Sequence, residues 1–569
     1  MANSLPHLGR QMKPVKEEDR KVSGSLDGSV SLSGAGRGSL LSRERSVAGA
    51  RFNRWYAPPA ALAIHLCIGM GYGFSVFWLP MSRLLANPAT TCAQQSFLDE
   101  LVTTSCNWTV PSLVHVFEIF IAVLGASAAV WGQWLEHAGP RRAGTYAAIF
   151  WGGGLVLMGI AVSVHQLWFI YLAAVVAGVG QGLGYITPVS TLIKWFPDRR
   201  GMATGFAIMG YGGGAMIGAP LAVLLMAHFS KDGVPGVAQT LIAMGIIYFV
   251  VMFAGAIGIR ITPSGWKPAG WQPAEQQSHR MVTQQNVHLN QSWKTPQFWL
   301  IWGLLCLNVT AGIGVISMAS PMFQDVFGAR LIDVHTAGAL TVAQKTAIAA
   351  AAAGLVGLIS LFNALGRIFW ASLSDRLGRK NLYLTLFIIG IIMYCLLPTW
   401  GHLSLPALFV ASICVILSMY GGGFATVPAY LADIFGPQMV GAIHGRLITA
   451  WSVAAVIGPS LIAGIRQVEL NNGVPQALLY DVTLYIMAVL LLGGLICNAF
   501  VKPVNSKHWM SGETLARERA LLHEDKAASG ADAAARGVFG IGGVLAWLVV
   551  GVPFLIGLYI AVVKAMTLF

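Results

Sequence analysis

Charged residues are scarce in this sequence. Asp, Glu, Lys and Arg make up 10% of the 569 residues, against about 25% in soluble globular domains. Hydrophobic residues make up 56%, and the mean hydropathy is +0.66. This balance excludes a soluble multi-domain protein and a disordered chain, and it argues against a nucleic-acid binder despite the net charge of +13. The composition predicts a polytopic membrane protein.

Other features are rare or missing as well. The 66 glycines follow no triplet repeat, which excludes collagen but suits closely packed membrane helices. The seven cysteines have no metal-ligand spacing, so we expect no metal and no cofactor. Cys92 and Cys106 precede the second predicted span, where a disulfide and two free thiols both fit. No GxxxxGK[ST] motif is present, so we expect no use of ATP.

Most of the charge lies at the two ends of the chain. Residues 1–54 hold 15 charges and residues 502–536 hold 11, which leaves 33 for the other 480 residues. The rest divides into apolar runs of the ~20 residues that a helix needs to cross a bilayer. Thirteen spans are predicted, near 57–82, 112–135, 143–164, 167–190, 202–227, 238–260, 297–322, 351–374, 381–400, 405–430, 441–465, 477–500 and 537–566.

Basic residues predict the orientation of these spans. Arg141, Lys194 and Arg376 lie in short loops on one side, and loops rich in Lys and Arg stay in the cytoplasm. We therefore expect a multi-pass protein of the bacterial inner membrane with a cytoplasmic N-terminus and, after the thirteenth span, a periplasmic C-terminus. Residues 1–54 lack the apolar region of a signal peptide. They are predicted to be a disordered tail, with a lipid or partner contact as the alternative.

The sequence contains an internal repeat. It reads GQWLEHAGPRR from Gly132 and ASLSDRLGRK from Ala371, which aligns Gly139 with Gly378 at an offset of 239. Further pairs share this offset: Glu136 with Asp375, Gly184 with Gly423, Phe196 with Phe435 and Pro220 with Pro459. A repeat of this length holds six spans and predicts two halves of like orientation. The predicted segments are 55–260 and 297–501 for the halves, 261–296 and 502–536 for cytoplasmic linkers, and 537–569 for an extra helix.

The paired loops resemble the signature loop of the major facilitator superfamily, G-x-x-x-[DE]-x-x-G-[RP]-[RK]. The resemblance implies an all-α membrane protein with that superfamily's fold, twelve transmembrane helices in two six-helix halves, here with one helix more. The first copy departs from the usual pattern at Glu136, His137 and Pro140. Residues expected to act in gating are Gly132, Glu136, Gly139, Arg141, Asp375, Arg376, Gly378 and Arg379.

Two charged residues fall well inside predicted spans, Arg367 and Glu118. A charge in hydrocarbon is costly and indicates a function. Guanidinium stays protonated and offers a planar fork to a carboxylate, so an unpaired Arg367 predicts an anionic substrate. The alternative is an arginine paired permanently with Glu118 or with backbone carbonyls.

The segment FNALGRIFW around Arg367 closely resembles the eighth helix of the oxalate/formate antiporter family, whose monocarboxylate-transporter relatives are similar. The segments GYGFSVFWLP, GQGLGYITP, YGGGAMIGAPL and HGRLITAWSVAAVIGP add to the resemblance. It implies that Arg367 binds a carboxylate. It also implies that the site is framed by aromatic residues, namely Tyr72, Tyr185, Tyr211, Tyr420 and Phe424.

Two departures from these relatives narrow the predicted substrate. Trp451 stands where the oxalate-exchanging prototype has a second cation, so a monocarboxylate of formate, lactate or pyruvate size is favoured over oxalate. Asn363 stands where proton-linked relatives have an Asp and does not titrate. Proton coupling would therefore use Glu118, His115 or His65. The alternatives are a solvated pair for His115 and Glu118, and ordinary packing for His65.

The sequence thus predicts a secondary transporter for small carboxylate anions, not an enzyme, embedded in the bilayer as a monomer. Oxalate:formate exchange and a carrier of another solute class are the alternatives, and a membrane-embedded enzyme is a remote one. The extra helix 537–569 resembles small single-span proteins encoded beside such antiporters, which suggests a fused accessory subunit. A helix that only stabilises or retains the chain in the membrane fits equally well.

Overall fold

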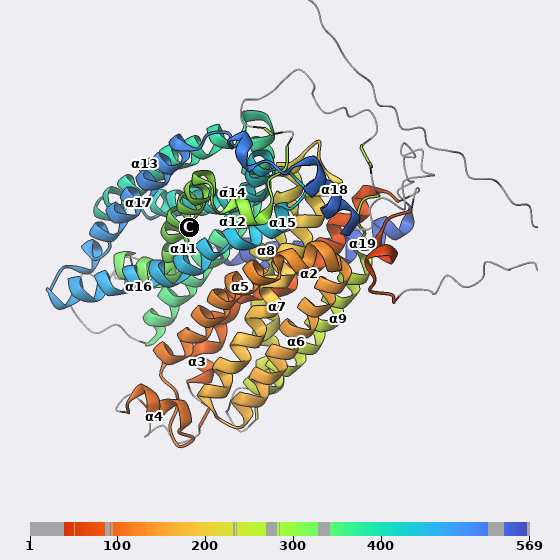
Figure 1. Cartoon of the computed structure of the whole chain (residues 1–569). Helices are drawn as coiled ribbons and strands as arrows, with labels where there is room; N and C mark the ends of the chain where they lie inside the picture. Colours follow the sequence, from red (N-terminus) through yellow and green to blue (C-terminus); the bar gives the residue numbers. More distant parts are fainter. Residues whose placement is uncertain are drawn as a thin grey trace, which may run out of the picture. The chain divides into compact units, whose positions relative to one another are not determined.

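A computed structural model of the chain describes residues 39–49, 52–82, 84–85, 92, 95–231, 234, 236–263, 265–268, 282–283, 285–327, 342–521 and 540–565. Regular structure in these ranges is helical, apart from isolated bridges between single residues, so the predicted all-α class is confirmed (Figure 1). The helices of the first half are α2 (Ala57–Ile68), η2 (Gly69–Phe77), α3 (Trp78–Met81), α4 (Phe97–Val102), α5 (Val110–Ala138), α6 (Pro140–Ser163), α7 (Leu167–Trp195), α8 (Arg200–His228) and α9 (Val237–Gly258).

The second half repeats this pattern of long helices. It contains α11 (Pro296–Phe327), α12 (Val342–Leu377), α13 (Arg379–His402), α14 (Pro406–Phe435), α15 (Val440–Leu447), α16 (Thr449–Asn471) and α17 (Asp481–Phe500). The remaining helices lie outside the halves: α1 (Arg43–Ser46), η1 (Arg54–Tyr56), α10 (Leu289–Ser292), η4 (Gln476–Leu478), η5 (Ser506–His508), α18 (Gly512–Leu521) and α19 (Ile541–Ala565).

Most of the predicted spans appear as long apolar helices. Eleven helical stretches among the described residues are long and apolar enough to cross a membrane. The predicted eighth and thirteenth spans correspond to α12 and α19. Two spans are interrupted: the first changes from α-helix to a nine-residue 3₁₀ segment at Gly69, and the eleventh is divided at Ile448. A 3₁₀ run longer than four residues is uncommon and often marks a functional position.

Packing separates the helices into two groups that meet along two seams. In the first half α6 packs against α7 and α9, and α5 against α7, while in the second α12 packs against α14, and α11 against α16 and α17. Between the halves α8 lies against α12, and α5 against α15 and α16 (Figure 1). Small residues let these helices approach closely: a Cβ on Gly205 would lie 2.6 Å from the carbonyl oxygen of Arg367, and one on Gly132 would lie 3.0 Å from Cα of Ala442.

Part of the predicted disordered tail is packed against the first half. The amide of Ala48 donates to the carbonyl of Ile261, and the amide of Ile261 donates to the carbonyl of Ser46, both at 2.9 Å. Residues 40–49 are therefore held beside the end of α9, in contrast to the prediction for 1–54. Residues 1–38 lie outside the described range.

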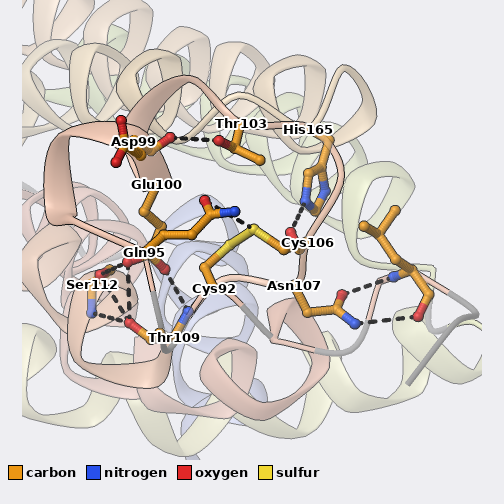
Figure 2. The surroundings of a disulfide bond; sticks show 11 residues. Cys92, Gln95, Asp99, Glu100, Thr103, Cys106, Asn107, Thr109, Ser112 and His165 are labelled. Atoms are coloured by element: carbon orange, nitrogen blue, oxygen red, sulfur yellow. Dashed lines mark hydrogen bonds between the residues drawn. A yellow bond between two sulfur atoms is a disulfide. The ribbon is translucent and has the colours of Figure 1, made fainter. Parts of the chain in front are cut away.

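A disulfide closes the loop between α3 and α5. Cys92 and Cys106 are bonded, and the buried carboxylate of Glu100 accepts hydrogen bonds from the amide of Thr109 and the hydroxyl of Ser112, both at 2.6 Å (Figure 2). The carbonyl of Cys106 accepts from Nε2 of His165 at 2.9 Å. The loop is thus tied to the start of α5 and to the turn before α7.

Replacing Cys92 and Cys106 together with Ala should destabilise this loop. A disulfide that closes a loop of this length is worth about 3 kcal/mol of unfolding free energy. We expect a lower melting temperature for the purified protein in detergent. Cys395→Ala, at an exposed free cysteine, serves as the control, and equal melting temperatures for both variants would contradict a stabilising role.

Candidate functional site

Helix α12 carries Arg367 deep into the bundle. Arg367 lies ten residues before the end of the helix at Leu377, which is about 15 Å along an α-helix and about half the thickness of the hydrocarbon core. Only 1% of its surface is exposed. The guanidinium is therefore held near the middle of the expected membrane thickness, where an uncompensated charge is most costly.

Two of the three nitrogens of this guanidinium form hydrogen bonds with described residues. Nε donates to Oδ1 of Asn363, one turn earlier in α12, at 2.9 Å. Nη1 donates to the carbonyl of Ile208 on α8 at 3.1 Å. The oxygen of this carbonyl is thus accessible to the guanidinium although it lies within an α-helix. Nη2 makes no hydrogen bond with any described residue although it is buried. Of the alternative pairings, a backbone carbonyl is met by Nη1 alone and Glu118 by none of the three nitrogens, while Nε bonds a side-chain amide. Among the described residues the positive charge has no counter-charge and Nη2 has no hydrogen-bond partner.

All six predicted aromatic site residues gather around Arg367. The Tyr185 ring lies 5.7 Å from Tyr211, 5.7 Å from Phe424 and 5.5 Å from Trp451 between centroids. Tyr72 joins the group through Tyr211, at 4.9 Å. The Arg367 guanidinium stands 5.7 Å from the centre of the Phe424 ring.

These rings come from both halves. Tyr72, Tyr185 and Tyr211 belong to η2, α7 and α8, whereas Tyr420 and Phe424 lie on α14 and Trp451 on α16. The hydroxyls of Tyr72 and Tyr420 are hydrogen-bonded across the boundary at 3.0 Å. The site is thus assembled only when the two halves meet.

Several polar atoms of this aromatic cluster are buried without a partner among the described residues. They are Nη2 of Arg367, the hydroxyls of Tyr185 and Tyr211, and Nε1 of Trp451. Buried polar groups are normally hydrogen-bonded, so Nη2 of the cation and the three such groups near it fit a ligand with acceptor oxygens. A carboxylate supplies a negative charge and two acceptors.

Helix breakage brings Tyr72 into the site. The α-helix changes to η2 just after Ile68, which leaves carbonyl groups without their regular partners. The side-chain amide of Gln181 donates to the carbonyl of Ile68 at 2.9 Å, and its Oε1 is buried without a partner in the described part of the chain. Gln181 is one turn from Tyr185 on α7, so it links the break to the site. Sequence reasoning missed Gln181, although the Gly-rich segment GMGYG was a signal for an irregular helix.

The three predicted proton carriers lie in two places, His65 in one and the pair His115 and Glu118 in the other. The ring of His65 stacks on Tyr185 at 5.3 Å, and its nitrogens face the carbonyls of Ala207 and Tyr185, so each neutral tautomer satisfies one carbonyl and a doubly protonated ring both. His115 and Glu118 do form a pair, with Nδ1 3.0 Å from Oε2. The side chain of His115 is 48% exposed and its ring contacts Phe97 of the disulfide loop.

The two signature loops adopt the same backbone shape. Gly139 and Gly378 both have positive φ, at 85° and 81°, a conformation that glycine adopts without a steric penalty. Each residue ends one helix and starts the next, α5 to α6 and α12 to α13. We refer to this end of the bundle as the loop end.

At the loop end, charged residues in and near the second signature loop connect the two halves. The carboxylate of Asp375 accepts from the amides of Gly201 and Met202 at 2.8 and 2.9 Å, where α8 begins and a negative charge is favourable. Arg379 pairs with Asp375 at 2.7 Å and with Asp433 at 3.2 Å. Asp433 also pairs with Arg200 of the first half at 3.0 Å. Sequence reasoning missed Arg200 and Asp433, which lie outside the motif.

The first signature loop is bonded mainly within its own half. Glu136 is paired with Lys194 at 2.7 Å. Arg141 donates to the carbonyls of Ile257 and Leu40 at 3.1 Å, so it closes the end of α9 and holds the N-terminal segment. Arg376 is exposed. Of the predicted gating residues of the first copy, two meet α15 of the other half directly: Gly132 at Ala442, and Oε1 of Glu136 at Gly441.

Two groups of long apolar helices with a buried cation at their boundary indicate a membrane transport protein. The sequence profile of the Major Facilitator Superfamily matches residues 61–344 and 334–569. The chain belongs to this superfamily.

Individual proteins show similarity over most of the chain. The oxalate:formate antiporter of Oxalobacter formigenes is 26% identical over 73% of this chain and 85% of its own length. Apicoplast pyruvate carrier 1 of Toxoplasma gondii is 22% identical over 67% of this chain and 78% of its own. The solved structure of the proton:xylose symporter XylE superimposes with a TM-score of 0.55 at 13% identity, covering 83% of this chain and 99% of that one, and supports the fold alone.

Asn363→Ala should destabilise the protein by releasing Nε of Arg367. Losing one hydrogen bond to a buried charged group costs about 1.5–3 kcal/mol of unfolding free energy, so we expect a lower melting temperature for the purified protein in detergent. Phe362→Ala, at a half-exposed neighbour on α12, is the control. Equal melting temperatures for the Asn363→Ala and wild-type proteins would mean that the Ile208 carbonyl suffices to hold the guanidinium.

Proposed function

We propose that this protein is a secondary active transporter that moves small carboxylate anions across the bacterial inner membrane by alternating access. The observation that carries the proposal is the buried Nη2 of Arg367, unpartnered among the described residues, within a cluster of rings from both halves. A bound carboxylate neutralises the guanidinium charge and accepts hydrogen bonds from the surrounding hydroxyl and indole donors. The names of the similar oxalate:formate antiporter and pyruvate carrier support the same substrate class.

A monocarboxylate is the favoured substrate. Trp451 is neutral, and its ring packs 4.8 Å from Phe424 and 5.2 Å from Tyr211. The second carboxylate of oxalate would therefore face rings rather than a cation, at a high desolvation cost. Formate, lactate and pyruvate place only one charge beside Arg367. Proton coupling through His65, His115 or Glu118 stays a prediction.

Alternating access accounts for the distribution of contacts between the halves. We assign the loop end to the cytoplasm, as the basic loops predict, and the N-terminus with it. The contacts of Asp375, Arg379 and Asp433 with the start of α8 and with one another then hold the cytoplasmic end closed. Rocking of the halves breaks these contacts and exposes the site to the cytoplasm.

Changing Arg367 should slow carboxylate transport in proteoliposomes loaded with unlabelled counter-substrate. We expect Arg367→Gln to reduce the exchange of labelled formate and pyruvate by roughly 100-fold, since it removes a charged hydrogen bond and the charge itself. Arg367→Lys should lose about tenfold, because an ammonium lacks the planar fork. Lys502→Gln, at an exposed linker residue, is the control.

Labelled oxalate is measured in the same vesicles. Faster exchange of oxalate than of formate and pyruvate would favour oxalate:formate exchange over the monocarboxylate assignment. Wild-type transport rates in both Arg367 variants would contradict the assignment of Arg367 to the binding site.

Asp375→Asn should ease opening of the cytoplasmic end. Val440 is the first residue of α15 and is buried. A cysteine placed there (Val440→Cys) therefore reports opening of this end through its rate of modification by a water-soluble maleimide. Loss of the charge that faces the start of α8 and pairs with Arg379 predicts modification about tenfold faster. Asp481→Asn, whose carboxylate pairs with His402 on other helices, is the matched control, and equal rates would exclude a latch at Asp375.

A further inference from the structure

Helix α19 is fixed to the first half by hydrogen bonds at its N-terminal end. The amide of Gly540 donates to the hydroxyl of Tyr56 at 3.0 Å, and Nε1 of Trp547 donates to the carbonyl of Trp55 at 3.1 Å. Both acceptors lie at the start of the first span. A helix that only anchors a chain in lipid requires no such bonds.

The same helix fits closely against α8. A Cβ on Gly213 would lie 2.6 Å from Cε2 of Phe554, and one on Gly557 would lie 3.1 Å from Cβ of Met216. Apolar residues gain nothing from leaving lipid for another apolar surface, so helices associate in membranes through close packing of this kind. The glycine-shaped contacts therefore indicate a specific docking position for α19 (Figure 1).

The third contact of α19 is with the other half. Val550, 7% exposed, shares an apolar cluster with Leu361 and Ala364 of α12 and with Leu62 and Met209 of the first half. Its neighbour Val549 is 71% exposed and faces outward. Ala364 lies three residues before Arg367, so the helix covers the α8–α12 seam directly behind the site.

We propose that α19 is a built-in clamp across the α8–α12 seam, which stabilises the arrangement with the loop end closed. Its bonds and glycine contacts tie it to the first half. Its contact with α12 is more extensive than its contact with α8, but among the described side chains it consists of apolar packing. When the halves rock, α19 stays with α2 and α8, and the packing of Val550 on Leu361 and Ala364 is lost. The clamp rests on the proposed alternating access, since without relative motion of the halves it has no state to favour.

The full-length protein with Val440→Cys tests the clamp. Val550→Ala in this background should speed maleimide modification of residue 440, quantified by peptide mass spectrometry, by about fivefold, as expected when a buried branched side chain is truncated. Val549→Ala makes the same chemical change on the exposed side and should leave the rate unchanged. A second variant, with residues 530–569 deleted, should show a larger increase.

The outcomes separate the clamp from the transport mechanism. If Val550→Ala and Val549→Ala are modified at the wild-type rate while added pyruvate still alters that rate, the clamp is wrong and alternating access stands. If pyruvate alters the rate in none of the proteins, the proposed function fails. If the deletion alone speeds modification, α19 acts through its bonds to the first half and the role assigned to Val550 is overturned.

Discussion

The candidate site is built around one buried cation, Arg367, which forms hydrogen bonds through only part of its guanidinium. Arg367 is buried, and its environment supplies two neutral oxygens but no counter-charge among the described residues. A buried cation with no hydrogen-bond partner at all would be too costly. Oxygens from Asn363 and Ile208 orient the guanidinium and leave its charge uncompensated among the described residues. Because the Ile208 carbonyl comes from the opposite half, the cation is sensitive to how the halves are arranged.

Glycine makes this arrangement possible. The seam between α8 and α12 places backbone against backbone at Gly205, and the seam between α5 and α15 does so at Gly132. Helices that meet through small residues pack backbone against backbone, without large side chains between them. Large rings are kept at the centre, where they exclude water from the guanidinium.

Sequence reasoning located the parts of this structure better than their connections. The offset of 239 predicted the two halves and the matching glycine turns at Gly139 and Gly378, because a repeated turn leaves the same residue at the same spacing. Residues Tyr185 and Trp451 were placed in the site by resemblance, and the structure brings their rings together at 5.5 Å. The 3₁₀ break after Ile68 was not predicted, since its carbonyl is satisfied by Gln181, far away in sequence.

A second connection was hidden for a similar reason. Arg200 and Asp433 pair across the halves, and no local motif contains both residues. The position of α19 was equally invisible, because a hydropathy run predicts a span without saying which helices it touches.

The repeat also explains why the two seams are held differently. At the offset of 239, Lys194 corresponds to Asp433 and Pro140 to Arg379. The first half thus has a positive charge where the second has the carboxylate of Asp433, and an uncharged residue where the second has Arg379. Glu136 is therefore neutralised by Lys194 within its own half, whereas Asp433 reaches Arg200 across the boundary. The two seams are therefore held differently: the one at α8 and α12 is ionic, and the one at α5 and α15 is packed through small residues. The ionic seam is the one that lies over Arg367, and it is also the one that α19 covers.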